Sequence, residues 1–287
     1  VKSALISKSP VRFYSLAIFS VTILLSESLR AQHEVTQLLS LSRTGGQVDS
    51  TLDLRITTGN HLVEIDSLHF SDPRISAEPK TLNPLPFTDQ PVVDYGNFSI
   101  TIPKDIPPGR YEVRASGRKG ISNPRAFLVT QLPCERPSSI SHDPNAPTLL
   151  PIGTLVQAKA TTAEVDFYQI VLGDEPLQIE LLAQQLDSRM IGQLKLFDAS
   201  GHELASARGA DDADPVIKTI PSLTPGDYLL AVHDFLYRGG EEYPYQVVAR
   251  PIDQADSLIV PLDAARGGLP EVWDAPSFAQ DQQDFGE

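Results

Sequence analysis

The stretch that decides the fold reads Pro225-Gly226-Asp227-Tyr228-Leu229-Leu230-Ala231-Val232. Successive side chains of a β-strand point to opposite faces of a sheet, so Tyr228, Leu230 and Val232 form one inward-facing set. Proline restricts φ at the first position of a tight turn, and glycine accepts the positive φ that follows in a type II turn. The stretch therefore predicts a turn that leads directly into a half-buried strand.

The same signal occurs earlier in the chain, at Pro108-Gly109-Arg110-Tyr111. Here Tyr111, Val113 and Ala115 share one parity. A tyrosine at this position can bury its ring and still form a hydrogen bond through its hydroxyl group. Two copies of the signal, far apart in the chain, predict two β-sandwiches in which a strand starts with similar geometry.

Apolar and polar residues alternate along much of the remaining chain, with little sustained helical periodicity. Short strands joined by Gly, Pro, Asn and Asp turns favour sandwiches over a parallel sheet. The sequence predicts an all-β fold of two consecutive antiparallel β-sandwiches, the first immunoglobulin-like and the second jelly-roll-like. Further strands are expected at residues 48–56, 61–70, 98–102, 126–130, 165–171, 177–181, 194–198 and 243–247.

The composition also predicts how the chain divides. Residues 131–150 are rich in Pro, Ser, Asn and Asp, which is typical of a linker. We expect a signal peptide at 1–31, the first sandwich at 32–130, the linker at 131–150 and the second sandwich at 151–252. We expect residues 253–287 to form a tail or the start of a truncated further β domain.

The N-terminal residues have the composition of a secretory signal. Basic residues, Lys2, Lys8 and Arg12, precede an apolar stretch at 13–25, and a small residue, Ala31, follows at the expected cleavage point. The apolar stretch is shorter than the roughly 20 residues of a membrane-spanning helix. The alternative is a retained anchor. We expect a secreted, periplasmic or cell-surface protein with no stable membrane span after cleavage.

The charge argues against one class of partner, and the cysteine content excludes an intrachain disulfide. The formal net charge is −14, and a strongly acidic protein repels phosphate backbones, so nucleic acid is not an expected partner. Cys134 is the single cysteine, so no disulfide can form within the chain and the cores alone must stabilise it. An incidental thiol and an intermolecular link both remain open for Cys134.

No catalytic motif can be assembled from the sequence. It contains no Gly-x-Ser-x-Gly elbow, His-Glu-x-x-His helix or Gly-rich phosphate loop. His233-Asp234 follows a strand, but nothing specifies a serine that would complete a catalytic triad. We therefore predict a protein that is not an enzyme, without catalytic residues or an organic cofactor.

Two clusters are candidates for binding. Tyr237, Tyr243 and Tyr245, near Gly239-Gly240, are candidates for a sugar or peptide groove. Alternation along the strand offers another interpretation, in which Tyr243 and Tyr245 belong to the core. The acidic run at residues 211–215 lacks EF-hand spacing, and it is either a solvated loop or a metal site.

Five motifs follow one another between about Glu135 and Arg250. They are Asp143-Pro144-Asn145, Ile152-Gly153-Thr154-Leu155, Asp166-Phe167-Tyr168-Gln169-Ile170, Leu194-Lys195-Leu196-Phe197-Asp198-Ala199-Ser200-Gly201 and the stretch at 225–232. In order and spacing they resemble the bacterial pre-peptidase C-terminal (PPC) domain family. The resemblance implies a jelly-roll-like sandwich appended to secreted peptidases and other exported proteins. Some members bind collagen or polysaccharide, and some carry calcium near the N-terminal linker.

The resemblance implies a calcium site at Glu135, Asp143, Asn145 and Asp166. Hard cations take carboxylate and amide oxygens as ligands. His142-Asp143-Pro144-Asn145 replaces part of the family's usual Glu-Pro-Asn-rich pattern, which weakens the match. The alternative role of these residues is to form Asx turns within the linker.

Residues 45–130 resemble immunoglobulin-like domains of the IPT/TIG type, more loosely. The likeness rests on residues 68–77, 106–113 and 120–127. Together the two resemblances predict an exported, non-catalytic binding or spacer protein. The expected partner is a polysaccharide or an extracellular or cell-envelope protein. The alternative is the accessory portion of a secreted hydrolase, such as a peptidase.

Overall fold

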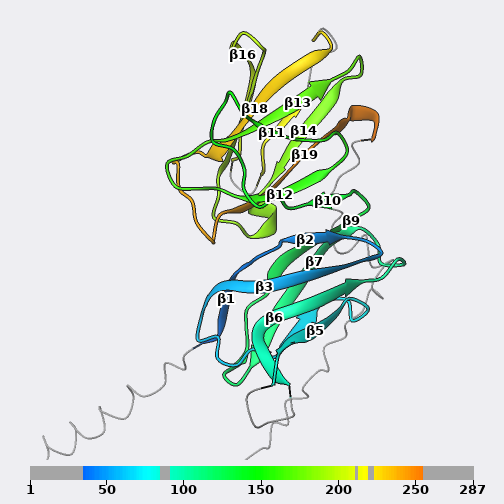
Figure 1. Ribbon diagram of the computed structural model, residues 1–287, viewed down its shortest axis with the longest axis vertical. Helices are drawn as coiled ribbons and strands as arrows, with labels where there is room; N and C mark the ends of the chain where they lie inside the picture. The colour runs from blue at the N-terminus through cyan, green and yellow to red at the C-terminus, as the bar shows by residue number, and fades with distance from the viewer. Residues whose placement is uncertain (1–34, 85–90, 211–212, 219–222, 255–287) are drawn as a thin grey trace, which may run out of the picture. The chain divides into compact units, whose positions relative to one another are not determined.

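The computed structural model describes residues 35–84, 91–210, 213–218 and 223–254. In these ranges the chain forms β-strands and two short 3-10 turns, η2 (Gln184–Leu186) and η3 (Ile252–Gln254). The expected signal peptide, and almost all of the expected C-terminal tail, lie outside the described residues. The strands pair into four sheets that make two β-sandwiches, so the predicted all-β fold is confirmed (Figure 1).

The first sandwich consists of a sheet in the order β1-β3-β6-β5 and a facing sheet in the order β2-β9-β7-β4, with β8 paired to β7. Its strands are β1 (Gln37–Leu41), β2 (Gly45–Gln47), β3 (Ser50–Asn60), β4 (Ser67–Phe70), β5 (Ser76–Leu82), β6 (Val92–Ile102), β7 (Gly109–Gly117), β8 (Gly120–Ile121) and β9 (Arg125–Thr130). Its core includes the fully buried side chains Leu38, Phe98, Ile100, Val113 and Phe127.

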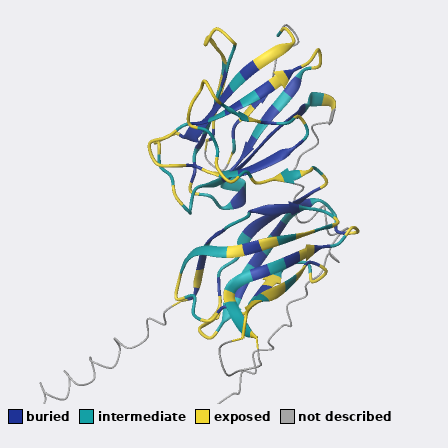
Figure 2. Ribbon diagram, in the orientation of Figure 1, coloured by how far each residue is buried: buried dark blue, intermediate teal, exposed yellow. Residues whose placement is uncertain are grey.

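The second sandwich pairs a sheet in the order β10-β12-β19-β14-β17 with one in the order β11-β13-β18-β15-β16. Its strands are β10 (Cys134–Glu135), β11 (Thr148–Leu149), β12 (Leu155–Lys159), β13 (Asp166–Leu172), β14 (Leu177–Leu182), β15 (Gly192–Phe197), β16 (Glu203–Arg208), β17 (Val216–Lys218), β18 (Gly226–Asp234) and β19 (Pro244–Pro251). Figure 2 shows the buried residues running along the inner strands of both sandwiches.

The two Pro-Gly-Tyr signals start β7 and β18 in the same way. The Tyr111 hydroxyl donates to the Pro107 carbonyl over 2.7 Å, and the Tyr228 hydroxyl donates to the Thr224 carbonyl over 2.8 Å. This confirms the predicted hydrogen bond. The glycines have φ values of 157° and 156°, so the turns are more extended than the predicted type II geometry.

Three short strands pair in parallel, which the predicted antiparallel sandwiches did not include. They are β2 on β9, β10 on β12 and β11 on β13. Each lies at one edge of its sheet and covers backbone groups that would otherwise be free to pair with another chain. The segment expected to be a linker thus supplies β10 and β11, one to each sheet of the second sandwich.

The two sandwiches meet in a buried region that we call the junction. A cluster of apolar side chains fills it, made of Ala126, Leu128, Leu155, Leu182, Leu186 and Val248. The Asp187 carboxylate accepts the Ala126 N–H over 2.7 Å and pairs with Arg110 over 3.1 Å. Gln246 donates to the Thr44 hydroxyl over 2.8 Å. The junction therefore combines apolar packing with specific polar contacts.

Candidate functional site

Asp234, the last residue of β18, organises the turn that follows it. Its side chain is fully buried, and its carboxylate accepts the backbone N–H groups of Ile191, Leu236 and Arg238 over 2.9–3.1 Å. Arg238 also forms an ion pair with it over 2.9 Å. Burial raises the pKa of Asp234, but the Arg238 guanidinium and the backbone donors outweigh burial and hold this pKa below its ordinary value.

His233 is not paired with this carboxylate. Its Nδ1 lies 2.8 Å from the backbone carbonyl of Asp234, and its ring stacks on Tyr237 with a centroid distance of 4.5 Å and an interplanar angle of 9°. A catalytic dyad would instead orient the imidazole with the carboxylate. The His233-Asp234 pair therefore serves to build the turn.

The turn presents three consecutive large side chains to solvent. Phe235 is 40% exposed, Leu236 60% and Tyr237 48%, and we call Phe235–Tyr237 the aromatic turn. Tyr237 has a φ of 54°, a left-handed conformation that costs a residue with a Cβ about 1–2 kcal/mol. Such strain persists where the surrounding structure holds it, and it concentrates at functional sites.

Close packing of the backbone holds the aromatic turn in place. The Ala163 N–H donates to the Tyr237 carbonyl and the Gly240 N–H donates to the Ala160 carbonyl, each over 2.9 Å. A Cβ at Gly239 would lie 2.3 Å from the Thr162 nitrogen, so only glycine fits there. The exposed side chains therefore stand on a backbone that is fixed on both sides.

The three tyrosines of the predicted groove do not share one surface. Tyr245 is fully buried and hydrogen-bonds the Tyr168 hydroxyl over 2.7 Å, so it belongs to the core and leaves the ligand set. Tyr243 is half-buried, packs against the core and lies under the Arg238 guanidinium at 5.5 Å. Tyr237 is the member that stays largely exposed.

Sequence reasoning missed Phe235 and Leu236 as neighbours of Tyr237. The Phe235 ring lies under the Arg208 guanidinium at 4.4 Å, a cation–π contact that steadies it. The available signal was a run of large apolar residues directly after a strand and just before Gly239-Gly240.

The predicted calcium ligands do not gather into one site in the structure. Asp143 and Asn145 form an Asx turn, in which Asp143 Oδ1 accepts the Asn145 N–H over 2.9 Å. Asp166 is buried at the start of β13, 3.0 Å from His142 Nδ1, whereas Glu135 lies on β10 in the other sheet. Among the described residues, no three His, Cys, Asp or Glu side chains gather in a way that could hold a metal ion.

Calcium binding at the linker stays a prediction, and it would require the ligands to move from their positions in this structure. The ion would have to draw Glu135 towards Asp143 and release Asp166 from His142. Calorimetry should then show heat of binding and a calcium-dependent rise in melting temperature, both lost in Asp143→Ala. Titrations with neither heat nor a thermal shift would contradict it.

Of the acidic run, Asp211 and Asp212 lie outside the described residues. The Asp214 carboxylate accepts the N–H groups of Ala183, Gln184 and Gln185 over 2.9–3.1 Å, where β14 leads into η2. Asp214 therefore serves as a cap for this turn. Burial raises its pKa above the ordinary value.

No family model and no curated protein matches this chain. Solved structures with some similarity include the pre-peptidase C-terminal domain of a collagenase from Bacillus anthracis, which is 13% identical with a TM-score of 0.29. The match covers 36% of this chain and 92% of the collagenase domain. The secreted serine protease VesC from Vibrio cholerae is 11% identical with a TM-score of 0.25, and the match covers 78% of this chain and about half of the protease, 52%.

A third similar structure comes from a mixed-linkage glucan utilization locus of Bacteroides ovatus and is in complex with a mixed-linkage heptasaccharide. It is 9% identical with a TM-score of 0.24, and the match covers 71% of this chain and 74% of the other.

No helix in the described part of the chain is long and apolar enough to cross a membrane.

Proposed function

We propose that this chain is a non-catalytic binding protein that acts outside the cytoplasm and holds a polysaccharide on the aromatic turn. The observation that carries the proposal is the half-exposed Tyr237 ring, stacked on His233 and fixed in a left-handed backbone conformation. The faces of a pyranose ring expose C–H groups that pack against an aromatic ring. A ring that is already ordered loses little conformational entropy when a sugar binds.

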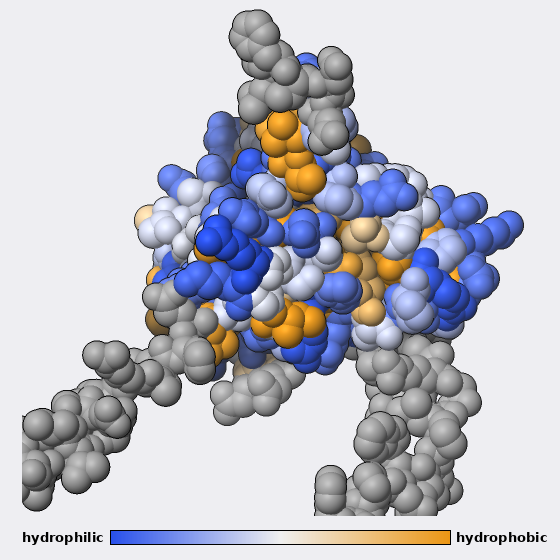
Figure 3. Space-filling model, turned by 90° about the horizontal axis from the view of Figure 1, so that it is seen from below, coloured by the Kyte–Doolittle hydropathy of each residue, from blue (hydrophilic) through white to orange (hydrophobic). Residues whose placement is uncertain are grey.

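The aromatic turn differs from the other exposed apolar side chains. On the face seen in Figure 3, apolar residues lie in several patches on a largely hydrophilic surface. Small, separate apolar patches of this kind are normal on soluble proteins. Phe235, Leu236 and Tyr237 instead stand together on a rigid turn, and contiguous exposed apolar groups mark interaction sites.

Tyr237→Asn is expected to weaken binding to a recognised polysaccharide by about tenfold or more, because loss of a central aromatic contact often costs about 2 kcal/mol and about 1.4 kcal/mol is tenfold. Asparagine tolerates the left-handed conformation, so the turn should keep its backbone. Affinity electrophoresis of the full chain against a panel of neutral and acidic polysaccharides measures the effect.

Tyr95→Asn provides the matched control, since Tyr95 is a tyrosine of the first sandwich that is 50% exposed. It should bind like the unmodified chain. Equal affinity of the Tyr237 and Tyr95 variants, or failure of the unmodified chain to bind any polymer of the panel, would sink the proposal.

A further inference from the structure

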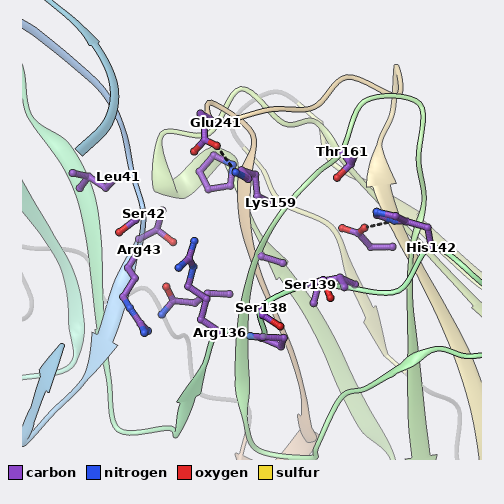
Figure 4. A pocket seen from close by; sticks show the side chains of 17 residues that line it. Leu41, Ser42, Arg43, Arg136, Ser138, Ser139, His142, Lys159, Thr161 and Glu241 are labelled. Atoms are coloured by element: carbon purple, nitrogen blue, oxygen red, sulfur yellow. Dashed lines mark hydrogen bonds and ion pairs between the residues drawn. The ribbon is translucent and has the colours of Figure 1, made fainter. Parts of the chain in front are cut away.

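A cavity of about 290 Å³ lies where the two sandwiches meet. Its walls come from the segment between β1 and β2, from the segment between β10 and β11, and from β12 with the residues after it (Figure 4). This volume is close to the lower end of small-ligand pockets, roughly 300 Å³, and it leaves room for about one sugar residue.

Two arginines, Arg43 and Arg136, line this cavity (Figure 4). Arg43 is half-buried and Arg136 is exposed, and burial together with the positive charge of Arg136 lowers the pKa of Arg43. Within the ranges that the structure describes, neither guanidinium forms an ion pair with a carboxylate. The Asp53 carboxylate attracts Arg43, but this effect is smaller than those of burial and of Arg136. The two guanidinium groups repel each other, and an anion bound between them would reduce the repulsion. We call this site the arginine cavity.

The other charged groups of the arginine cavity are already paired. Lys159 forms an ion pair with Glu241, and His142 lies 3.0 Å from the buried Asp166, as the dashed lines in Figure 4 show. The two carboxylates therefore have positive or protonatable partners of their own. The positive charge that remains for a ligand is that of the two arginines.

A buried acceptor lines the same arginine cavity. Gln157 is 3% exposed and donates its Nε2 to the Gly45 carbonyl over 3.0 Å. Its Oε1 is buried and has no hydrogen-bond partner among the described residues, and a buried polar atom without a partner destabilises the fold. A ligand hydroxyl that donated to Gln157 Oε1 would satisfy it. The hydroxyl-bearing residues Ser138 and Ser139 also line the cavity.

We propose that the arginine cavity binds a uronic acid residue. The guanidinium groups of Arg43 and Arg136 bind its carboxylate through charge-assisted hydrogen bonds, for which arginine's planar fork is well suited. Gln157 Oε1 accepts a hydrogen bond from one of its hydroxyls. This site shares no residue with the aromatic turn, so each proposal can fail without the other.

Calorimetric titration of the full chain with sodium glucuronate, glucose and sodium sulfate tests this inference. We expect glucuronate to bind, glucose to bind at least tenfold more weakly, and sulfate to compete less well than glucuronate. Arg43→Gln and Arg136→Gln should each weaken glucuronate binding by about tenfold. Arg118→Gln removes the same charge from an exposed arginine that does not line the cavity, and it should leave binding unchanged.

Thermal melting keeps the test independent of folding defects. Glucuronate should raise the melting temperature of the unmodified chain, because a ligand that binds only the folded state stabilises it. Arg136→Gln should melt no lower than the unmodified chain without ligand, since it removes a repulsion. Unchanged glucuronate affinity in both glutamine variants, or sulfate binding at least as tightly as glucuronate, would overturn the proposal.

Discussion

Replacing Asp234 with alanine is expected to lower the free energy of unfolding by about 3 kcal/mol. The change removes the acceptor of three backbone N–H groups and of the Arg238 guanidinium from a fully buried position. Each buried donor left without a partner costs about 1–3 kcal/mol, although water can reach part of this turn and reduces the sum. Urea denaturation, read as the shift of the midpoint at constant slope, measures the loss.

Asp198→Ala is the control for this prediction. The Asp198 carboxylate also accepts two backbone N–H groups, of Ser200 and His202, but its side chain is 32% exposed. Water can replace those bonds, so the loss of stability should be clearly smaller than in Asp234→Ala. A loss in Asp234→Ala no larger than in Asp198→Ala would contradict the role given to Asp234. The Asp234 variant should also lose polysaccharide affinity, because the aromatic turn depends on this carboxylate.

Local signals made most of the strands predictable. The parity of Tyr228, Leu230 and Val232 places three buried side chains on β18, and all three face the core in the structure. Alternation likewise favoured a core position for Tyr245, which the structure bears out against the groove interpretation. These properties depend on neighbours in the sequence, which periodicity can detect.

Features that depend on distant residues could not be predicted. β10 and β11 have two residues each, too few for any periodicity, and they form only because β12 and β13 offer free edges. Arg43 and Arg136 stand in different segments, and only the folded junction brings their charges together.

A second large loss of stability is expected where a buried chain of hydrogen bonds in the second sandwich is broken. The Tyr245 hydroxyl donates its one proton to Asp166 Oδ2 over 2.5 Å, so the Tyr168 hydroxyl must donate to the Tyr245 oxygen over 2.7 Å. Tyr245→Phe removes both bonds and one of them ends on a carboxylate, so we expect a loss of about 2–3 kcal/mol. Tyr168→Phe removes one bond between neutral groups and should cost about 1 kcal/mol. Similar losses in the two variants would contradict this order of bonds.

The pH dependence of stability shows whether folding favours the charged or the neutral form of Asp166, the acceptor of the Tyr245 hydrogen bond. Burial raises the pKa of Asp166 above its ordinary value, against the opposing effects of Tyr245 and His142, while Glu164 adds to the rise. The folded state therefore holds this proton more tightly than the unfolded state. The resulting stabilisation is present below the unfolded pKa of about 3.9 and is lost as the pH rises through the folded pKa.

Asp166→Asn cannot titrate, yet its amide oxygen can still accept the Tyr245 proton. Its melting temperature relative to the unmodified chain should therefore increase as the pH rises from about 4 through the raised pKa of Asp166. Melting curves of both proteins at closely spaced pH values measure this difference. A difference that stayed constant with pH would show that Asp166 is equally easy to ionise in the folded and unfolded states. A difference that fell with rising pH would show that His142 and Tyr245 together outweigh burial.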